Sequence, residues 1–442
     1  MLKLKISQSQ YKARRTRLLQ QLPSDSVVVL PAATHLHRNA DAEYPFRQNS
    51  DFYYLTGFNE PDGLLLLLPG RPEGEYILIC QPRDPAMEVW TGYRAGPEGC
   101  CEVYGADQAF VLGEADEKLP ELLDGRRSLY YPMGQSTAFD QRVQAWLATL
   151  RKRVRQGCEP PEALLQIDSL LHEMRLIKDD EEVAVMSAAA DISAAAHVKA
   201  MQQCRPGMME YMLEACIMHH CAMQGARFQA YSPIVGGGEN GCILHYIENS
   251  APLCDGDLVL IDAGCELDCY ASDITRTFPV NGRFNEQQRA LYELVLDTQL
   301  QCIEAIRPGV PWNDIHDLSV RVITAGLIRL GLLSGDLDEL IASEAYRPFY
   351  MHRSGHWLGM DVHDVGSYKQ QGEWRPLEPG MVLTVEPGIY VAPDNEAVEP
   401  HWRGIGIRIE DDVLVTPEGH TVLTAAAPKS VEAIERLMRE AQ

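Results

Sequence analysis

The feature that most constrains the fold is a pair of acids embedded in apolar, strand-like runs. Residues 258–261 (LVLI) lead directly into Asp262, and Asp273 follows eleven positions later in a second run of the same kind. Side chains alternate along a strand, so Asp262 faces the same way as the apolar residues two and four positions before it. If residues 265–270 (CELDCY) form a hairpin loop, the two carboxylates lie on neighbouring strands, about 5 Å apart. The fold must therefore compensate two close, buried charges.

Two carboxylates at that separation repel each other by roughly 3–4 kcal/mol at an effective dielectric near 20. Burial adds a desolvation cost, so an isolated pair would share a proton instead of ionising fully. A cation between them would remove both costs. The alternative is that one aspartate caps a turn or pairs with Arg276, and this stretch alone supports both interpretations equally.

The C-terminal region adds two more acids on strands. Residues 382–386 (VLTVE) predict a strand that ends at Glu386, and residues 404–415 (GIGIRIEDDVLV) alternate strictly between apolar and other side chains. In the second run Arg408 and Glu410 share the face opposite the isoleucines. A half-buried sheet would normally carry neutral residues there, so these positions favour a site over a plain core.

Three histidines lie between these strands and the helices before them, within twelve residues: His352, His356 and His363. One histidine is usually only a hydrogen-bonded polar residue, but three beside four strand-borne acids predict a metal site. Carboxylate and imidazole ligands suit hard divalent ions, and we favour Mn²⁺ over cobalt and zinc. Four carboxylates exceed the needs of one ion, so we expect two, about 3.5–4 Å apart with a bridging water. No phosphate-binding loop followed by Lys-Ser or Lys-Thr is present, which favours hydrolysis of an amide.

These motifs resemble those of the pita-bread metallopeptidases, which include aminopeptidase P, prolidase and methionine aminopeptidase. The resemblance covers nearly the whole chain. Its C-terminal part rests on residues 261–279 (IDAGCELDCYASDITRTFP), 354–366 (SGHWLGMDVHDVG), 383–390 (LTVEPGIY) and 406–413 (GIRIEDDV). Residues 41–63 (DAEYPFRQNSDFYYLTGFNEPDG) are similar to the N-terminal block of aminopeptidase P and its prolidase relatives. Methionine aminopeptidases lack that block.

The resemblance implies a metal-ligand set by position. Asp262 would bind one ion, while Asp273 and Glu410 would bridge both. His356 and Glu386 would complete the second ion's shell.

The resemblance also implies residues that act around the metals. Histidines that orient the substrate and stabilise the oxyanion match His245, His352 and His363. Arg408 would support substrate binding, and Glu386, or Asp41 through a water, would protonate the leaving proline nitrogen. Trp90 would line the substrate entrance, and Tyr390 is a weaker match to a substrate-binding residue. For Asp41, Trp90 and Tyr390, fold support or packing is an equal alternative.

We expect an α+β chain of two domains. Residues 1–174 would form a small α/β domain with a connecting helix, because strand-like runs such as 26–32 (SVVVLPA) alternate with helical patterns. By the resemblance, residues 175–442 would form a pita-bread catalytic domain, a curved and largely antiparallel sheet covered by helices. Residues 157–167 (GCEPPEALLQI) read as a connector. Helices are predicted over residues 140–152, 174–201, 209–224, 285–306, 312–330 and 430–441.

Charge and cysteine content limit the partners and the compartment. The net charge of −24 argues against nucleic acid or an anionic membrane as a partner. Twelve scattered cysteines fit reduced thiols, so we expect a cytoplasmic protein without a secretory signal. Residues 236–241 (GGGENG) satisfy G-x-G-x-x-G, but we expect a strand after them, which excludes a dinucleotide site.

The resemblance implies an activity: release of the N-terminal residue from peptides with proline in second position, by attack of a metal-bridging hydroxide. One alternative is a prolidase that cleaves only X-Pro dipeptides. A less favoured alternative is a metal-free peptide-binding relative that has lost catalysis. Relatives are often homotetramers, so we expect a homotetramer.

Overall fold

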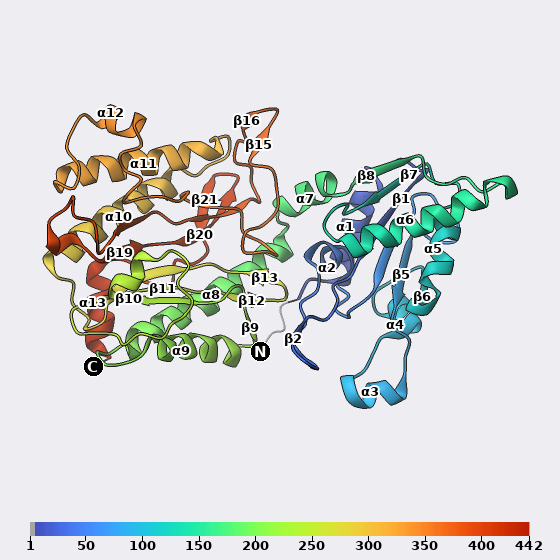
Figure 1. Cartoon of the computed structure of the whole chain (residues 1–442), viewed down its shortest axis with the longest axis horizontal. Coiled ribbons are helices and arrows are strands. Elements are labelled where there is room, and N and C mark those ends of the chain that lie inside the picture. Colours follow the sequence, from blue (N-terminus) through green and yellow to red (C-terminus); the bar gives the residue numbers. More distant parts are fainter. Residues whose placement is uncertain (1–4, 442) are drawn as a thin grey trace. The chain divides into compact units, whose positions relative to one another are not determined.

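The computed structural model describes residues 5–441. They fold into two compact units, Ile6–Arg175 and the chain from Leu176 onward (Figure 1). None of the described helices combines the length and the apolar character needed to cross a membrane. Each unit has its own hydrophobic core.

The N-terminal unit is built on a six-stranded sheet in the order β6-β5-β4-β1-β7-β8. Pairing of β4 with β1 and β5 is antiparallel, and the other pairs are parallel. The strands are β1 (Ser26–Pro31), β4 (Leu64–Leu67), β5 (Tyr76–Cys80), β6 (Gln108–Val111), β7 (Ser128–Tyr131) and β8 (Ala163–Gln166). A separate hairpin pairs β2 (His37–Asn39) with β3 (Ala42–Glu43). The helices are α1 (Gln8–Leu19), α2 (Ser50–Thr56), α3 (Pro85–Thr91), α4 (Gly96–Glu102), α5 (Ala115–Leu123), α6 (Thr137–Lys152) and α7 (Asp168–Leu176).

The predicted connector at residues 157–167 is partly wrong. Pro160 and Pro161 do interrupt regular structure, but β8 follows them and pairs in parallel with β7 at the sheet edge. An edge position requires only one set of hydrogen bonds, so a short strand with exposed side chains is accommodated there.

The helices of the C-terminal unit are α8 (Asp180–Gln203), α9 (Glu210–Met223), α10 (Glu286–Ala305), α11 (Trp312–Arg329), α12 (Leu337–Ala342) and α13 (Val431–Glu440). Side-chain caps mark two of the predicted helix starts in this unit: the Asn285 side chain accepts a hydrogen bond from Gln288 N–H, and the Ser430 side chain accepts one from Ala433 N–H. The helix predicted over 174–201 is wrong at its start. Asp179 caps α8 in a capping box with Glu182, so residues 177–179 separate α7 from α8.

The C-terminal strands form small antiparallel sheets that together make a curved layer. Their orders are β10-β11-β14, β13-β12-β9, β17-β20-β21 and β18-β19, with a separate β15-β16 hairpin. The strands are β9 (Phe228–Gln229), β10 (Ile234–Gly237), β11 (Leu258–Asp262), β12 (Cys265–Leu267), β13 (Tyr270–Ala271), β14 (Thr275–Pro279), β15 (Lys369–Gln370), β16 (Glu373–Trp374), β17 (Val382–Val385), β18 (Gly388–Val391), β19 (Ile405–Arg408), β20 (Asp411–Thr416) and β21 (Gly419–Val422).

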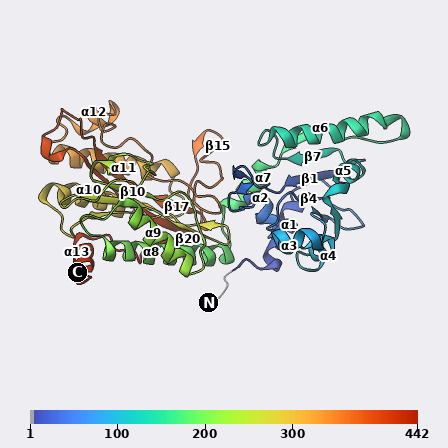
Figure 2. The ribbon, with the colours of Figure 1, turned by 60° about the horizontal axis from the view of Figure 1, so that its bottom comes forward.

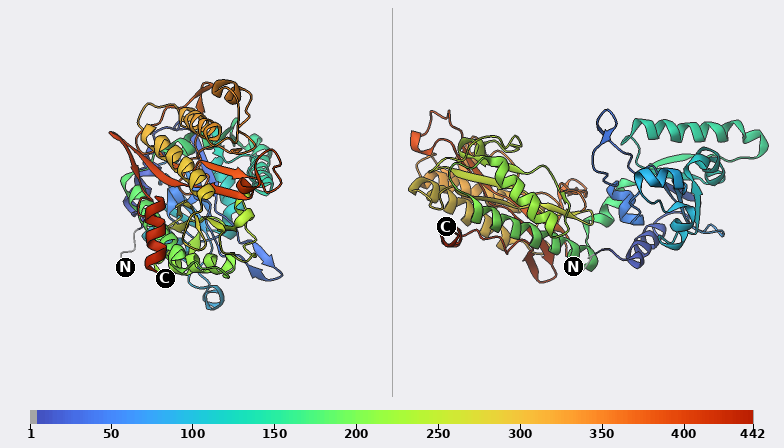
Figure 3. Two further views of the ribbon diagram at one scale, coloured as in Figure 1. Left: turned by 90° about the vertical axis from the view of Figure 1, so that its left-hand side faces the viewer. Right: turned by 90° about the horizontal axis from the view of Figure 1, so that it is seen from below.

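Two helix pairs cover these strands. Figures 1 and 2 show the strands between α8 and α9 on one side and α10 and α11 on the other. The same arrangement is visible in the left-hand view of Figure 3, where green helices lie below the strands and yellow-orange helices above them. The buried isoleucines of β19 and the residue after it, Ile405, Ile407 and Ile409, belong to this core. The opposite face of β19 is therefore free to line a site.

The segment between the first two acids differs from the predicted loop. β11 pairs with β14, and Asp262 lies opposite Thr275. Residues 265–270 are not a loop but a second hairpin, in which β12 pairs with β13 around Asp268 and Cys269. Both turn residues have positive φ (48° and 68°), as a tight hairpin turn requires. The strand expected after residues 236–241 is also wrong, because Gly238–Cys242 is a 3₁₀ helix.

Candidate metal centre and active site

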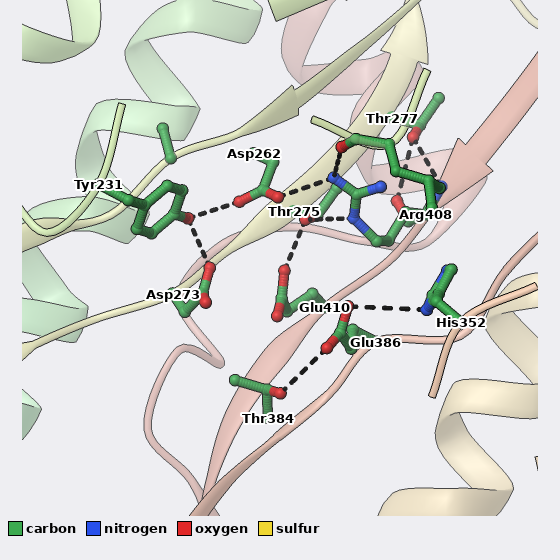
Figure 4. A network of polar contacts seen from close by, with 12 residues as sticks. Tyr231, Asp262, Asp273, Thr275, Thr277, His352, Thr384, Glu386, Arg408 and Glu410 are labelled. Carbon is green, nitrogen blue, oxygen red and sulfur yellow. Dashed lines mark hydrogen bonds and ion pairs between the residues drawn. The ribbon is translucent and has the colours of Figure 1, made fainter. Parts of the chain in front are cut away.

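Four acids from distant parts of the chain converge on one cavity of about 910 Å³. Asp262 ends β11, and Asp273 lies two residues before β14. Glu386 follows β17, and Glu410 joins β19 to β20 (Figure 4). Ligand atoms of Asp273, His356 and Glu410 all lie within 4.8 Å of one another. The fold thus brings together the five predicted metal ligands, all of which line this cavity.

Backbone hydrogen bonds position two of these ligands beside β17. Thr384 N–H donates to His356 O, and Glu386 N–H donates to Ser354 O, both at 2.9 Å. The close approach requires Gly355, since a Cβ there would lie 2.1 Å from Thr384 O. The predicted motif around His356 is therefore a strand-like segment docked on β17.

His356 is oriented for metal binding. Its Nδ1 lies 2.9 Å from the carbonyl oxygen of Trp357, so Nδ1–H can donate there. That leaves Nε2 facing Asp273 Oδ2 at 3.4 Å and Glu386 Oε1 at 3.8 Å. A ligand histidine characteristically has its second nitrogen fixed in this way.

Sequence reasoning missed Tyr231, which lies between the first two acids. Its hydroxyl is 2.5 Å from Asp262 Oδ1 and 2.5 Å from Asp273 Oδ1 (Figure 4). A phenol carries one proton and can donate to only one carboxylate at a time. The second contact needs another proton on the cluster, or a cation. No periodic pattern marks Tyr231, because its role depends on a contact 31 residues away in the chain.

The pKa values of the acids in the cavity also indicate that the site carries more negative charge than its own side chains compensate. Burial raises the pKa of Glu410 well above its usual range, and the charges on Asp273 and Glu386 add to the rise. Burial also raises the pKa of Glu386, to about 7. Burial alone would lower the pKa of His356, but its hydrogen bond to Asp273 and the charge on Glu386 raise it to about 9. The pKa of Asp273 is raised as well, by burial and by the charge on Asp262. Three carboxylates whose pKa values are raised, beside one imidazole, fit a site for hard divalent cations.

Replacing Tyr231 by phenylalanine is expected to weaken Mn²⁺ binding by about 10–100-fold, because the hydroxyl contacts two carboxylates of the predicted metal site and would hold them in place. Calorimetric titration of metal-stripped protein measures this affinity. Tyr54→Phe is the matched control, since it removes a buried hydroxyl that contacts Met174 O in the N-terminal unit. Unchanged affinity in Tyr231→Phe would show that this hydroxyl does not organise the site.

A second network fixes Asp262. Arg408 donates to Asp262 Oδ2 at 2.7 Å (Figure 4). It also donates to Tyr390 Oη, at 2.9 Å. Tyr390 Oη lies 2.9 Å from His352 Nε2, whose other nitrogen lies 2.7 Å from Arg353 O. Burial and the charge of Arg408 lower the pKa of His352 to about 4, so this imidazole is neutral. Tyr390, which was predicted to bind substrate, is only 1 % exposed. Its buried hydroxyl instead orients the side chains of Arg408 and His352.

The other two predicted histidines also line the cavity. The His363 ring lies across that of His356, with centroids 4.4 Å apart. The segment that carries His245 is held by the fully buried Glu210, whose carboxylate accepts hydrogen bonds from residues before and after His245 in the chain. The donors are Gly237 N–H, Asn240 Nδ2, Tyr246 Oη and Ala251 N–H, at 2.8–3.0 Å.

Asp41 and Trp90 belong to the N-terminal unit. Asp41 is exposed beside the β2–β3 turn, and Trp90 in α3 is 83 % exposed. The described residues that line the cavity all come from the C-terminal unit and include neither of them. Their predicted roles in proton transfer and substrate entry stay predictions.

Comparisons with known proteins agree over almost the full length. Residues 184–417 match the model of metallopeptidase family M24, and residues 11–130 match the aminopeptidase P N-terminal domain. The chain is 48 % identical to the Xaa-Pro aminopeptidase of Escherichia coli K12, over 98 % of both chains. The Haemophilus influenzae Xaa-Pro aminopeptidase is 46 % identical, also over 98 % of both. Among solved structures, Pseudomonas aeruginosa aminopeptidase PepP superimposes with a TM-score of 0.98 at 56 % identity, covering 99 % of each chain. Zn-substituted E. coli aminopeptidase P in complex with product gives 0.97 at 48 %, again covering 99 % of each.

Proposed function

The chain belongs to metallopeptidase family M24, and we propose that it releases the N-terminal residue from peptides with proline in second position. The predicted resemblance and the α+β, pita-bread fold are confirmed by the family models and the structural matches. The observation that carries the proposal is the convergence of Asp262, Asp273, His356, Glu386 and Glu410 in one cavity. The relatives named above, which this chain matches over 98 % of its length, are Xaa-Pro aminopeptidases.

The cofactor we propose is a pair of divalent cations, with Mn²⁺ preferred. Asp262 would hold one ion, His356 and Glu386 the other, and Asp273 and Glu410 would contact both. The carboxylate-rich donor set supports a hard ion. Such a pair, when bound, supplies an activated water and polarises the scissile carbonyl.

The side chains around this centre fix where the peptide is cut. The free α-amino group binds beside Asp262, whose second oxygen is fixed by Arg408. Only the first peptide bond then reaches the acids. His363 and His245 orient N–H donors toward the carbonyl oxygen as it gains negative charge.

The same side chains manage the proton. Glu386 would deliver a proton to the proline nitrogen as the peptide bond breaks. Asp41 through a water is the alternative donor. That nitrogen belongs to a tertiary amide without N–H, so recognition of the ring depends on shape. The cavity supplies apolar walls from Ile234, Leu244, Ile247, Val362 and Tyr368.

A peptide panel tests the proposal. Metal-loaded protein is expected to hydrolyse Ala-Pro-Gly and to leave Ala-Ala-Gly and N-acetyl-Ala-Pro-Gly uncut, because it requires both the ring and the free amine. Faster cleavage of Ala-Pro than of Ala-Pro-Gly would favour the prolidase alternative. Absence of hydrolysis with Mn²⁺, Co²⁺ and Zn²⁺ would favour a non-catalytic peptide-binding protein, although all five ligands are present.

We also propose a homotetramer in the cytoplasm. Self-association is supported by α3, which has no buried residue and exposes Val89 and Trp90, with Tyr93 just beyond its end. Exposed apolar side chains gathered in this way are typical of a contact surface. The cytoplasmic assignment is supported by the cysteines, all twelve of which are free thiols.

A further inference from the structure

Two basic side chains of the cavity have no acidic partner. Arg353 and Lys369 both line it, and within residues 5–441 neither forms an ion pair. The third basic side chain of the cavity, Arg408, is by contrast bound to Asp262. The chain has 63 acidic against 39 basic residues, so two unpaired cations beside a substrate cavity point to a ligand that brings the missing negative charge.

Trp374 fixes both cationic groups in place. The Lys369 ammonium lies 4.4 Å and the Arg353 guanidinium 5.2 Å from the centre of its indole ring. Lys369 and Trp374 are directly paired across the β15–β16 hairpin, and Arg353 Nη2 also donates to Asn313 Oδ1 at 2.5 Å. Stacking on an aromatic face orients a cation without neutralising it. We call Arg353, Lys369 and Trp374 the cationic rim.

The cationic rim and Asp262 line the same cavity. The substrate's amino end lies at Asp262 under the proposed function. His352 Nδ1 lies 4.0 Å from Glu386 Oε2, and Figure 4 shows these two residues on a different side of the site from Asp262. Arg353 follows His352 in the chain. A peptide that extends from Asp262 toward His352 therefore reaches the rim with the residues after its proline.

We propose that the cationic rim binds a carboxylate located after the proline of the substrate. The inference rests on the proposed function and names its substrate class. Two sources share this chemistry: the C-terminal carboxylate of a short peptide, and an acidic side chain in a longer one. Glu373, next to Trp374, points away from it along the strand and does not compete directly for the cations.

Two matched peptide pairs test the rim. Ala-Pro-Gly against its C-terminal amide isolates the terminal carboxylate, and Ala-Pro-Glu-amide against Ala-Pro-Gln-amide isolates the side chain. With metal-loaded full-length protein, the charged member of at least one pair is expected to have about threefold to tenfold higher kcat/KM, mainly through KM, as one or two solvent-exposed ion pairs allow. The kcat/KM of the charged peptide divided by that of its neutral partner should fall toward one at high salt, because salt screens solvent-exposed ion pairs.

Variants locate the effect. In Lys369→Met with Arg353→Met, the ratio is expected to fall to about one. Lys199→Met with Arg329→Met removes the same two charges from exposed positions on α8 and α11 outside the cavity, and it should keep the wild-type ratio. The peptide pair whose kcat/KM ratio falls in the double variant identifies the source of the carboxylate.

Equal kcat/KM within both pairs for the wild type, or a preference that survives in the double variant, would overturn the inference. In those cases hydrolysis of the neutral amides would leave the proposed function intact. If the wild type hydrolysed none of these peptides, the proposed function would fall, and the inference with it.

Discussion

Replacing Asp273 by asparagine is expected to lower kcat/KM for Ala-Pro-Gly by at least about 10³-fold, the upper range for loss of one preorganised charged group. Asp273 contacts Tyr231 and His356 and shares a ligand group with Glu410. Asparagine keeps its shape but cannot supply the negative charge. Metal content measured by mass spectrometry should fall together with activity.

The same change is expected to stabilise the metal-free protein. Burial and the charge on Asp262 raise the pKa of Asp273, so the folded site is strained by its excess of acids. Removing one acid should raise the thermal midpoint of the metal-free protein while it reduces the rise on adding Mn²⁺. Asp255→Asn, which changes an exposed aspartate that contacts Asn281, is the matched control. Wild-type turnover and metal content in Asp273→Asn would contradict the metal assignment.

Raising the pH from 7 to 9 is expected to destabilise the metal-free protein. Below pH 7 the buried His352, whose pKa is lowered to about 4, acts in the opposite direction, because the unfolded chain binds a proton that the folded site excludes. Burial raises the pKa of Glu386 from 4.5 to about 7, and its partners raise the pKa of His356 from 6.5 to about 9. Between pH 7 and 9 the folded protein holds more protons than the unfolded chain, so its free energy of unfolding falls as the pH rises. One unit of pKa difference corresponds to about 1.4 kcal/mol. The two groups interact, so we expect a combined loss of a few kcal/mol.

Divalent metal is expected to reverse this trend, because its ligands bind in their deprotonated forms. Thermal unfolding at pH 7, 8 and 9, with and without Mn²⁺, measures both effects. Stabilisation by Mn²⁺ should grow with pH, and Asp273→Asn should flatten the metal-free slope. A metal-free protein whose stability rose between pH 7 and 9 would contradict the charge balance described for the site.

The parts of the fold that depend on local pattern could be predicted from the sequence. Strict alternation over residues 404–410 separates Ile407, in the core, from Arg408 and Glu410, in the cavity. Caps such as Asn285 mark helix starts within a residue or two. The acids among the five predicted ligands stood out because they follow apolar runs, and the resemblance to the pita-bread metallopeptidases implied the full set.

The parts that depend on distant contacts could not be predicted. Tyr231 lies in no periodic pattern, and its partners follow 31 and 42 residues later. The break between α7 and α8 is fixed from elsewhere in the unit: Lys178 N–H donates to Gly380 O, and its buried ammonium pairs with Asp364. Helix propensity alone would carry the helix through these residues.

The most direct test of the central claim is a Mn²⁺ titration of metal-stripped protein, with Ala-Pro-Gly hydrolysis and bound metal followed together. We predict that the stripped protein is inactive and that hydrolysis of the Ala-Pro bond reaches its plateau when two ions are bound per chain. Full hydrolysis by the stripped protein, or a plateau reached without metal binding at the Asp273 cluster, would contradict the account.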